Sequence, residues 1–191
     1  MMDMLQDVEK VLISEEELQK RIKELGKQIS EDYKDRNLVM ISVLKGSIVF
    51  MADLMRAITI PCKIDFLATS LYKDETIPTG EVRFTKDLDK PIAGCDVLIV
   101  EDILDSGKTL SFVEDILLVR NPNSIRICTL LDKPERREVD ITAEYVGFTV
   151  PNEFVIGYGL DYAQLYRNLP YIGIIKQEAV KRISKELSEG K

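Results

Sequence analysis

Two neighbouring carboxylates, Glu101 and Asp102, are the residues of the sequence most suited to binding or catalysis. They directly follow residues 96–100, an apolar run of strand length. In an open parallel sheet, ligands bind beyond the carboxyl ends of the strands, so both acids are expected at the binding edge. Vicinal ribose hydroxyls or a divalent metal ion would satisfy such a pair of carboxylates.

The next residues make the transition from this strand to a helix predicted from about residue 107 to residue 119. They are Asp105, Ser106, Gly107, Lys108 and Thr109. The start of a helix offers unpaired backbone N–H groups and the positive end of the helix dipole, Gly107 permits close approach, and the two hydroxyls add donors. This pattern favours a phosphate monoester site and, beside the two acids, a ribose-5-phosphate derivative with a metal ion.

Two other interpretations of this stretch can be compared with the phosphate site. The purely structural alternative, with no ligand, is an N-capped helix that starts beside two solvated acids. An ATPase P-loop is excluded, because that motif requires a glycine where this sequence has Asp102.

Strands and helices alternate along the chain with short links, which indicates right-handed βαβ units and a mostly parallel sheet. Strands are predicted at residues 38–44, 62–70, 96–100, 124–131, 144–150 and 154–157, with residues 101–106 as a loop. Helices are predicted at residues 15–33, where Ser14 and Glu17 form a capping box, at 48–58 and 107–119, and from 177. Residues 72–80 are polar and predict a mobile loop before a short strand near residues 81–84.

Composition limits the function classes. The chain has 191 residues, of which 45% are hydrophobic and 31% charged, a balance typical of a soluble globular domain. No apolar run is long enough to cross a bilayer and no signal peptide is recognisable, so a cytoplasmic protein is expected. The net charge of −7 disfavours nucleic-acid binding. The basic cluster at residues 133–137 is too short for such a surface, although it could hold one phosphorylated small molecule.

The sequence contains no histidine, which removes every Ser-His or Cys-His nucleophile pair. Acid–base chemistry must therefore depend on carboxylates, lysine, tyrosine or a metal-bound group. The three cysteines, Cys62, Cys95 and Cys128, are widely spaced among apolar neighbours and lack metal-ligand spacing. They are expected to be reduced, buried thiols.

Residues 97–110 resemble the phosphoribosyl-pyrophosphate motif of type I phosphoribosyltransferases: an apolar strand, two acids, two apolar residues and then Asp-Ser/Thr-Gly-x-Thr. The resemblance implies that Glu101 and Asp102 bind the ribose hydroxyls, directly or near magnesium. It also implies that residues 105–109 hold the 5-phosphate. Asp105, between the phosphate loop and the purine, is then the candidate general base.

Further segments resemble the hypoxanthine–guanine branch of this family, in the expected order. Residues 44–47 are similar to the pyrophosphate loop, which implies a non-proline cis peptide before Lys45 and pyrophosphate contacts from Lys45 and Gly46. Lys133 is implied to donate to the exocyclic oxygen of the purine and so to select hypoxanthine and guanine over adenine.

Residues 154–162 resemble the purine-binding segment of the same branch. By that likeness, Phe154 stacks on the base and the backbone of Val155 meets the edge of the base. Asp161 would lie beside the base and a second magnesium ion. Arg167 would grip pyrophosphate.

The lid, expected at about residues 70–84, is where the chain departs from this branch. Family members typically carry Ser-Tyr, often followed by glycine, whereas this chain has Leu71 before Tyr72 and a lysine after it. The backbone amide of Leu71 is then the group expected to make the contact. The likeness covers a core of about residues 38–176, and implies one domain over residues 1–191 with the α/β type I fold, a mostly parallel central sheet flanked by helices and a small hood or lid region.

The resemblance implies a magnesium-dependent transfer of 5-phosphoribosyl from phosphoribosyl pyrophosphate to hypoxanthine or guanine, giving IMP or GMP. It also implies a homodimer or homotetramer. One alternative is a regulator that senses phosphoribosyl pyrophosphate on this fold while binding nucleic acid, which the acidic balance disfavours. Another is a sister transferase for xanthine, adenine or a pyrimidine; Lys133 and residues 154–162 favour a purine with an exocyclic oxygen.

Overall fold

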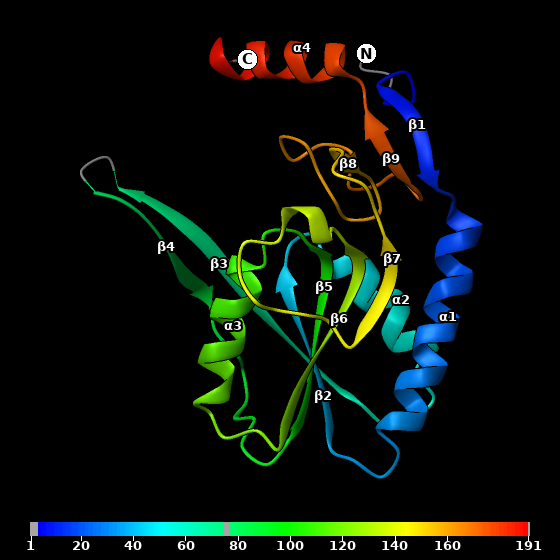
Figure 1. Ribbon diagram of the computed structural model, residues 1–191, viewed down its shortest axis with the longest axis vertical. Helices are drawn as coiled ribbons and strands as arrows, with labels where there is room; N and C mark the ends of the chain where they lie inside the picture. The colour runs from blue at the N-terminus through cyan, green and yellow to red at the C-terminus, as the bar shows by residue number, and fades with distance from the viewer. Residues whose placement is uncertain (1–3, 75–76, 191) are drawn as a thin grey trace.

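A six-stranded sheet forms the centre of the computed structural model, which describes residues 4–74 and 77–190 (Figure 1). The strands lie in the order β4-β3-β2-β5-β6-β7. Their bounds are β2 (Leu38–Leu44), β3 (Lys63–Asp74), β4 (Ile77–Lys86), β5 (Asp96–Leu104), β6 (Ser124–Asp132) and β7 (Tyr145–Thr149). All neighbouring strands are parallel except β3 and β4, which are antiparallel. The predicted, mostly parallel α/β sheet is confirmed.

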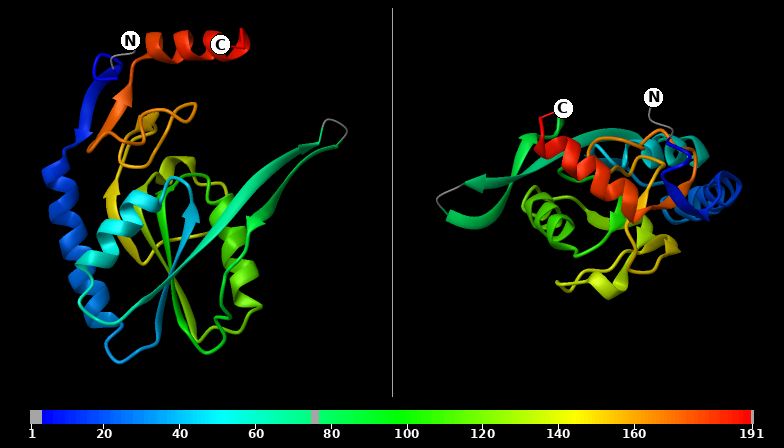
Figure 2. Two further views of the ribbon diagram at one scale, coloured as in Figure 1. Left: turned by 180° about the vertical axis from the view of Figure 1, so that it is seen from behind. Right: turned by 90° about the horizontal axis from the view of Figure 1, so that it is seen from above.

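Helices cover both faces of this sheet (Figures 1 and 2): α1 (Glu15–Asp32) and α2 (Ile48–Ala57) on one face and α3 (Lys108–Leu118) on the other. Alternate residues of β2 demonstrate the arrangement. Met40 packs in the core beneath α1 and α2, whereas Val39 and Ile41 pack in the core that includes α3. Burial on both faces explains why the sequence of this strand is a continuous apolar run.

A second, three-stranded antiparallel sheet lies above the carboxyl ends of the central strands (Figure 1). It consists of β1 (Val8–Ile13), β9 (Ile172–Ile175) and β8 (Val155–Ile156), and α4 (Gln177–Ser188) follows it. We call these four elements the hood. A small hood or lid region was expected, but β1 and β9 were not predicted, and β8 is shorter than the predicted strand at residues 154–157. Pairing between chain ends more than 150 residues apart leaves no local pattern.

Two segments differ from the sequence predictions in ways that affect the site. Strand β5 continues to Leu104, so the predicted loop at residues 101–106 is wrong for residues 101–104 and confirmed for residues 105–106; both acids lie in the strand itself. The strand predicted to end at Ser70 continues to Asp74, so the predicted loop at residues 72–80 is also wrong. Strands β3 and β4 instead extend as a long antiparallel ribbon away from the sheet (Figure 1), with residues 75–76 outside the described part. The predicted helices of residues 15–33 and 48–58 are confirmed, and the capping box between Ser14 and Glu17 is present.

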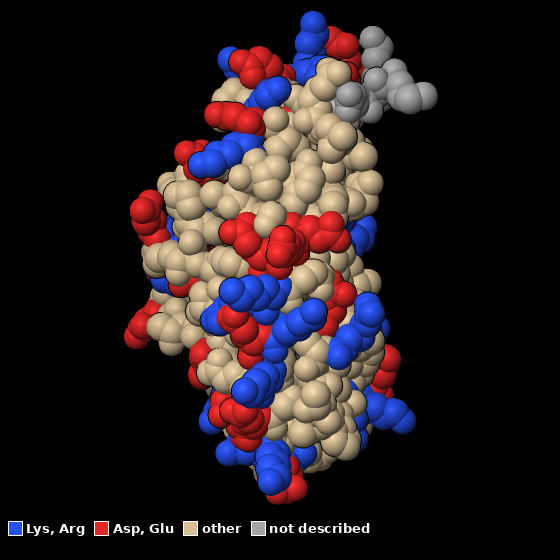
Figure 3. Space-filling view, turned by 90° about the vertical axis from the view of Figure 1, so that its right-hand side faces the viewer, with Lys and Arg blue, Asp and Glu red and all other residues tan. Residues whose placement is uncertain are grey.

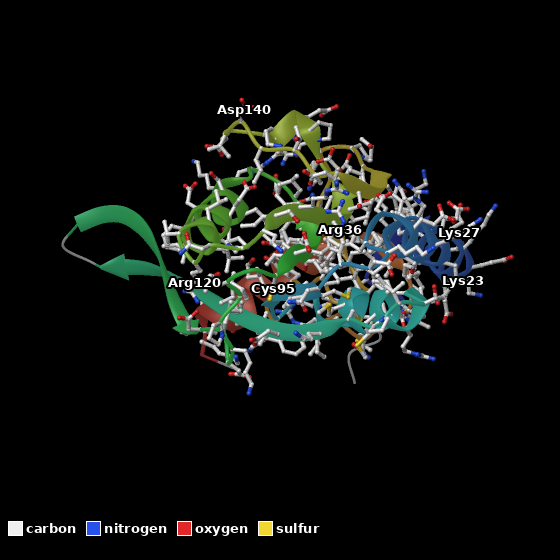
Figure 4. The ribbon with its side chains drawn as sticks, turned by 90° about the horizontal axis from the view of Figure 1, so that it is seen from below. Lys23, Lys27, Arg36, Cys95, Arg120 and Asp140 are labelled. Carbon is white, nitrogen blue, oxygen red and sulfur yellow. The ribbon has the colours of Figure 1, made fainter. Side chains whose placement is uncertain are left out.

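The end of the sheet remote from the hood is seen in Figure 4, where Arg36, Cys95 and Arg120 lie. All three cysteines are free thiols; Cys95 and Cys128 are buried and Cys62 is half-buried. Burial raises the pKa of the Cys62 and Cys128 thiols.

Among the described residues, no helix combines the length and apolar character that crossing a membrane requires.

Candidate active site

The two carboxylates near the carboxyl end of β5 are buried in different surroundings. Asp102 is 7% exposed, and one of its oxygens accepts a hydrogen bond of 2.7 Å from the Ile103 backbone N–H. Oε2 of Glu101 is buried and has no hydrogen-bond partner within the described residues. Burial and the neighbouring Asp102 carboxylate raise the pKa of Glu101 well above its ordinary value, and burial also raises the pKa of Asp102. Hydroxyl donors or a cation would therefore stabilise this pair.

The residues predicted to hold a phosphate, here called the cradle, follow at the turn from β5 into α3. Gly107 is the N-cap of α3 with φ of 85°, a left-handed conformation that favours glycine. A cavity of about 130 Å³ opens here, which compares with roughly 30 Å³ for one water molecule in the liquid. Its lining comprises Glu101, Ile103, Leu104, Asp105, Ser106, Gly107, Thr109 and Leu110. Five of the sequence-predicted residues thus meet around one space at a helix N-terminus: Glu101, Asp105, Ser106, Gly107 and Thr109. Asp102 is not in this lining; its carboxylate lies against Gly46. Lys108 is not in the lining either and forms an ion pair with Glu138.

A segment that follows β6 supports this cradle from outside. Arg136 Nε donates to Asp105 Oδ1 at 3.1 Å, and Arg137 donates to the Asp105 backbone oxygen at 2.7 Å. The backbone N–H of Glu138 donates to the Ser106 carbonyl at 2.9 Å. Arg136 and Arg137 were not predicted from the sequence as partners of the cradle. The basic cluster at residues 133–137 was the only feature of the sequence that pointed to them. Both arginines bind acids of the protein.

The predicted pyrophosphate loop connects β2 to α2. The Leu44–Lys45 peptide bond is cis, as the resemblance implied. A Cβ atom added to Gly46 would overlap the Asp102 carboxylate, and a Cβ added to Gly159 would overlap the Gly46 carbonyl oxygen. Gly46 is therefore enclosed between the acid pair and the loop that follows β8. The structure brings Gly46 of the predicted pyrophosphate loop beside Asp102, one of the two acids that the sequence predicted as a ribose site.

The predicted purine-binding residues lie around β8 and the end of β6. Lys133 is 6% exposed, and its Nζ donates to the Glu153 carbonyl oxygen at 2.8 Å. An ammonium group has three donors, so this bond uses one of them. Phe154 is half exposed and packs edge-on against Tyr162, with ring centroids 5.4 Å apart. Val155 is buried in β8.

Asp161 and Arg167, predicted for magnesium and pyrophosphate respectively, bind each other at 2.7 Å. Arg167 also donates to the Gly159 carbonyl oxygen at 2.7 Å, and its charge acts on Asp102. The guanidinium thus lies between the purine-side loop and the acid pair. Any anion that recruits Arg167 must compete with Asp161.

The predicted lid residues lie on the β3–β4 ribbon. In the backbone register, Leu71 is opposite Val82 and Tyr72 is opposite Glu81. The side chains of both residues are outside the described part of the structure.

The donors of this site suit magnesium in a specific way. No group of three or more histidine, cysteine, aspartate or glutamate side chains in the described part could form a cage for a metal ion. Mg²⁺ rarely uses such cages; it is usually bound by one or two carboxylates together with substrate phosphates and water. The unpartnered oxygen of Glu101, beside Asp102, matches that pattern. These two residues could hold magnesium once a phosphorylated substrate is present.

The comparisons with known proteins agree with this geometry. The phosphoribosyl transferase domain model matches residues 12–163. The hypoxanthine-guanine phosphoribosyltransferase of Bacillus subtilis is 53% identical over 173 residues, which are 91% of this chain and 96% of that protein. A crystal structure of a hypoxanthine phosphoribosyltransferase from Staphylococcus aureus has a TM-score of 0.88 at 51% identity, over 92% of this chain and 96% of that one.

A longer relative contains the same region. The bifunctional protein TilS/HprT of Listeria monocytogenes is 52% identical over 172 residues, which are 90% of this chain but 26% of that protein. The chain thus spans about a quarter of the length of these bifunctional relatives. The family model matches more than half of the chain, and the Bacillus subtilis relative aligns over nearly its whole length. The chain therefore belongs to the phosphoribosyltransferase family, in its hypoxanthine–guanine branch.

Proposed function

We propose that this protein transfers the 5-phosphoribosyl group of phosphoribosyl pyrophosphate to hypoxanthine or guanine, giving IMP or GMP and pyrophosphate. One observation carries the proposal: Glu101, whose buried Oε2 has no hydrogen-bond partner within the described residues, lines the same cavity as the N-terminal turn of α3. That combination suits a ligand in which a phosphate and ribose hydroxyls are joined. The names and the high identity of the relatives support the same activity.

Different residues would act on the pyrophosphate leaving group and on the purine. Breaking the bond to pyrophosphate builds negative charge on the leaving group, and Lys45 with Arg167 would stabilise it. Arg167 is held by Asp161, so the pyrophosphate of the substrate would compete with that carboxylate for the guanidinium. Magnesium, proposed to bind at Glu101 and Asp102 and, as a second ion, at Asp161, would supply further neutralisation of the leaving group.

At the purine, Asp105 is the proposed general base. Its carboxylate would take the proton from the imidazole nitrogen that attacks the ribose. Phe154 would stack on the ring, and the backbone of Val155 would meet its edge. Ser106, Gly107, Lys108 and Thr109 would hold the 5-phosphate, although Lys108 must then leave or share its ion pair with Glu138.

Lys133 is the proposed selector of the base, which gives a direct prediction. We expect Lys133→Met to lower kcat/KM for hypoxanthine and guanine by about 5- to 150-fold, the equivalent of the roughly 1–3 kcal/mol that a lost buried hydrogen bond costs. The preference over adenine should shrink by the same factor. Steady-state kinetics with the three bases measure both effects.

Lys63→Met provides the matched control for this change. Lys63 is exposed and donates to Asn37 Oδ1 at 2.9 Å, at the start of β3 and remote from the site. We expect that variant to keep the kinetic constants of the parent. If Lys133→Met kept the full preference for hypoxanthine over adenine, Lys133 would have no role in base selection.

The deciding experiment is a spectrophotometric assay with magnesium and phosphoribosyl pyrophosphate against hypoxanthine, guanine, xanthine and adenine in turn. Turnover with the first two bases is the expected result, and a clear preference for xanthine would favour the sister transferase. Nucleic-acid binding without turnover would favour the regulator. On the face that carries α1, acidic and basic side chains are interspersed (Figure 3), which does not support that alternative.

The proposal includes a cytoplasmic location and assembly into a homodimer or homotetramer, as the resemblance implies. The acidic composition and the net charge of −7 are consistent with a protein that avoids nucleic acid and anionic membranes. Size-exclusion chromatography with light scattering measures the assembly.

A further inference from the structure

The loop between β8 and β9 contains a tyrosine in an unusual backbone conformation. Gly157, Tyr158 and Gly159 have φ values of 97°, 50° and 102°, three consecutive left-handed residues. Glycine adopts this conformation readily, but a tyrosine does so only where its surroundings hold it. The contacts of Tyr158 therefore indicate what fixes this loop.

Tyr158 is held by its side chain and by its backbone. The side chain is 4% exposed, and its hydroxyl donates to Asp53 Oδ2 on α2, while its backbone N–H donates to the Leu169 carbonyl at 2.8 Å. Asp53 Oδ2 also accepts from Gln19 Nε2 of α1 at 2.9 Å. Burial and the Asp53 carboxylate raise the pKa of Tyr158 far above its ordinary value, so the phenol remains protonated as the donor. The bond thus joins the purine-side loop to two helices.

The same helix carries the pyrophosphate loop. Helix α2 begins at Ile48, two residues after Gly46. The backbone of Gly159, next to Tyr158, lies so close to the Gly46 carbonyl that a Cβ atom would not fit. The carbonyl oxygen of Gly159 also accepts from Arg167. A shift of Tyr158 relative to α2 would therefore change the spacing between Lys45 and Arg167, the two proposed pyrophosphate ligands.

We propose that Tyr158 is a positioning residue whose hydrogen bond to Asp53 fixes the purine-side loop against the pyrophosphate loop, and so sets the affinity for pyrophosphate. The inference rests on the proposed function, because it assumes that pyrophosphate binds at Lys45 and Arg167. Tyr158 itself is buried and does not need to contact a substrate.

Calorimetric titration of the full chain with magnesium pyrophosphate tests this role. We expect Tyr158→Phe to weaken binding by roughly tenfold, the effect of one lost hydrogen bond to a charged group. Tyr145→Phe is the matched control, because Tyr145 is 2% exposed and its hydroxyl donates to Asp32 Oδ2 at 2.7 Å, at the amino end of β7. Both variants should lower the thermal midpoint, but Tyr145→Phe should bind pyrophosphate within about twofold of the parent.

Asp53 provides a second pair of variants that keeps Tyr158 intact. Asp53→Asn retains an oxygen that can accept from the phenol and should preserve affinity, whereas Asp53→Ala should match Tyr158→Phe. Asp53→Ala also removes the bond from Gln19 and the ion pair with Arg56. Combining Asp53→Ala with Tyr158→Phe should nevertheless add no further loss of pyrophosphate affinity to that of Asp53→Ala, since both variants remove the same bond between Tyr158 and Asp53.

The outcomes distinguish failure of the positioning role of Tyr158 from failure of the proposed function. If the parent binds pyrophosphate and Tyr158→Phe binds it equally well, or if Tyr145→Phe loses as much affinity, the positioning role is wrong while the proposed function stands. If Tyr158→Phe does not fold, equal affinity of Asp53→Ala and the parent overturns the role in the same way. A parent chain that binds neither pyrophosphate nor phosphoribosyl pyrophosphate overturns the proposed function as well.

Discussion

Asp105→Asn is expected to lower turnover by about 10²- to 10⁴-fold, the usual contribution of a positioned general base. The amide cannot take a proton from the imidazole nitrogen of the purine. Its oxygen can still accept from Arg136 Nε, and the Asp105 backbone oxygen still accepts from Arg137. The cradle should therefore keep its geometry, and the affinity for phosphoribosyl pyrophosphate should stay within a few-fold of the parent.

Turnover at saturating substrates and calorimetric binding of phosphoribosyl pyrophosphate separate the two effects of this change. Asp115→Asn is the control, because Asp115 is an exposed carboxylate of α3, away from the cavity. It loses the same charge and should keep full activity. Unchanged turnover in Asp105→Asn would remove Asp105 from the mechanism, and a large loss of affinity would make it a substrate ligand instead.

The ion pair between Asp105 and Arg136 bears on this role. Its two side chains are 40% and 50% exposed, and such a pair contributes about 0–1 kcal/mol. If a purine binds at Asp105 as proposed, it would therefore displace Arg136 at little cost. The pair between Asp161 and Arg167 is less exposed, at 24% and 25%, so the proposed pyrophosphate ligand would meet a stronger competitor there. Around the site, Asp105 and Asp161 thus carry arginine partners, whereas one oxygen of Glu101 has no partner within the described residues.

Much of the central sheet was predictable because burial on both faces produces continuous apolar runs. Residues 38–44 and 96–100 have no alternation to read, yet their length and bounding residues identify strands. The cradle was predictable for a similar reason. A left-handed N-cap requires glycine, and Gly107 stands where the strand gives way to the helix.

The remaining features depend on contacts that local sequence does not encode. Strand β1 pairs with β9 from the other end of the chain, with irregular register, so neither has a periodic signature. The extension of β5 through the acid pair follows from pairing with β6, in which Glu101 is opposite Thr129. The β3–β4 ribbon is held by backbone pairing, which polar residues also make, so a polar composition there was a poor guide to a loop. Arg136 and Arg137 could not be predicted as partners of the cradle, because their contacts depend on how residues 133–138 fold against it.

Gly46→Ala is expected to reduce kcat/KM for phosphoribosyl pyrophosphate by at least about 10²-fold, the cost of displacing reacting groups by roughly 1 Å. An added methyl group would occupy the place of the Asp102 carboxylate. Either Asp102 must leave its hydrogen bond to Ile103, or the pyrophosphate loop must move away from it. Both responses disturb a proposed ligand, so steady-state kinetics with varied phosphoribosyl pyrophosphate should detect the change.

Gly94→Ala separates this steric effect from general damage to the backbone. Gly94 has φ of 73°, so alanine is strained there, but the added Cβ would meet no described atom within 4 Å beyond the adjacent residues of the chain. That variant should lose stability and keep its kinetic constants, whereas Gly46→Ala should lose kcat/KM whether or not its thermal midpoint falls. If Gly46→Ala retained full kcat/KM, close contact between the pyrophosphate loop and the acid pair would not be needed for the reaction. Lys45, Asp102 and Arg167 would then act without the tight spacing that Gly46 and Gly159 permit.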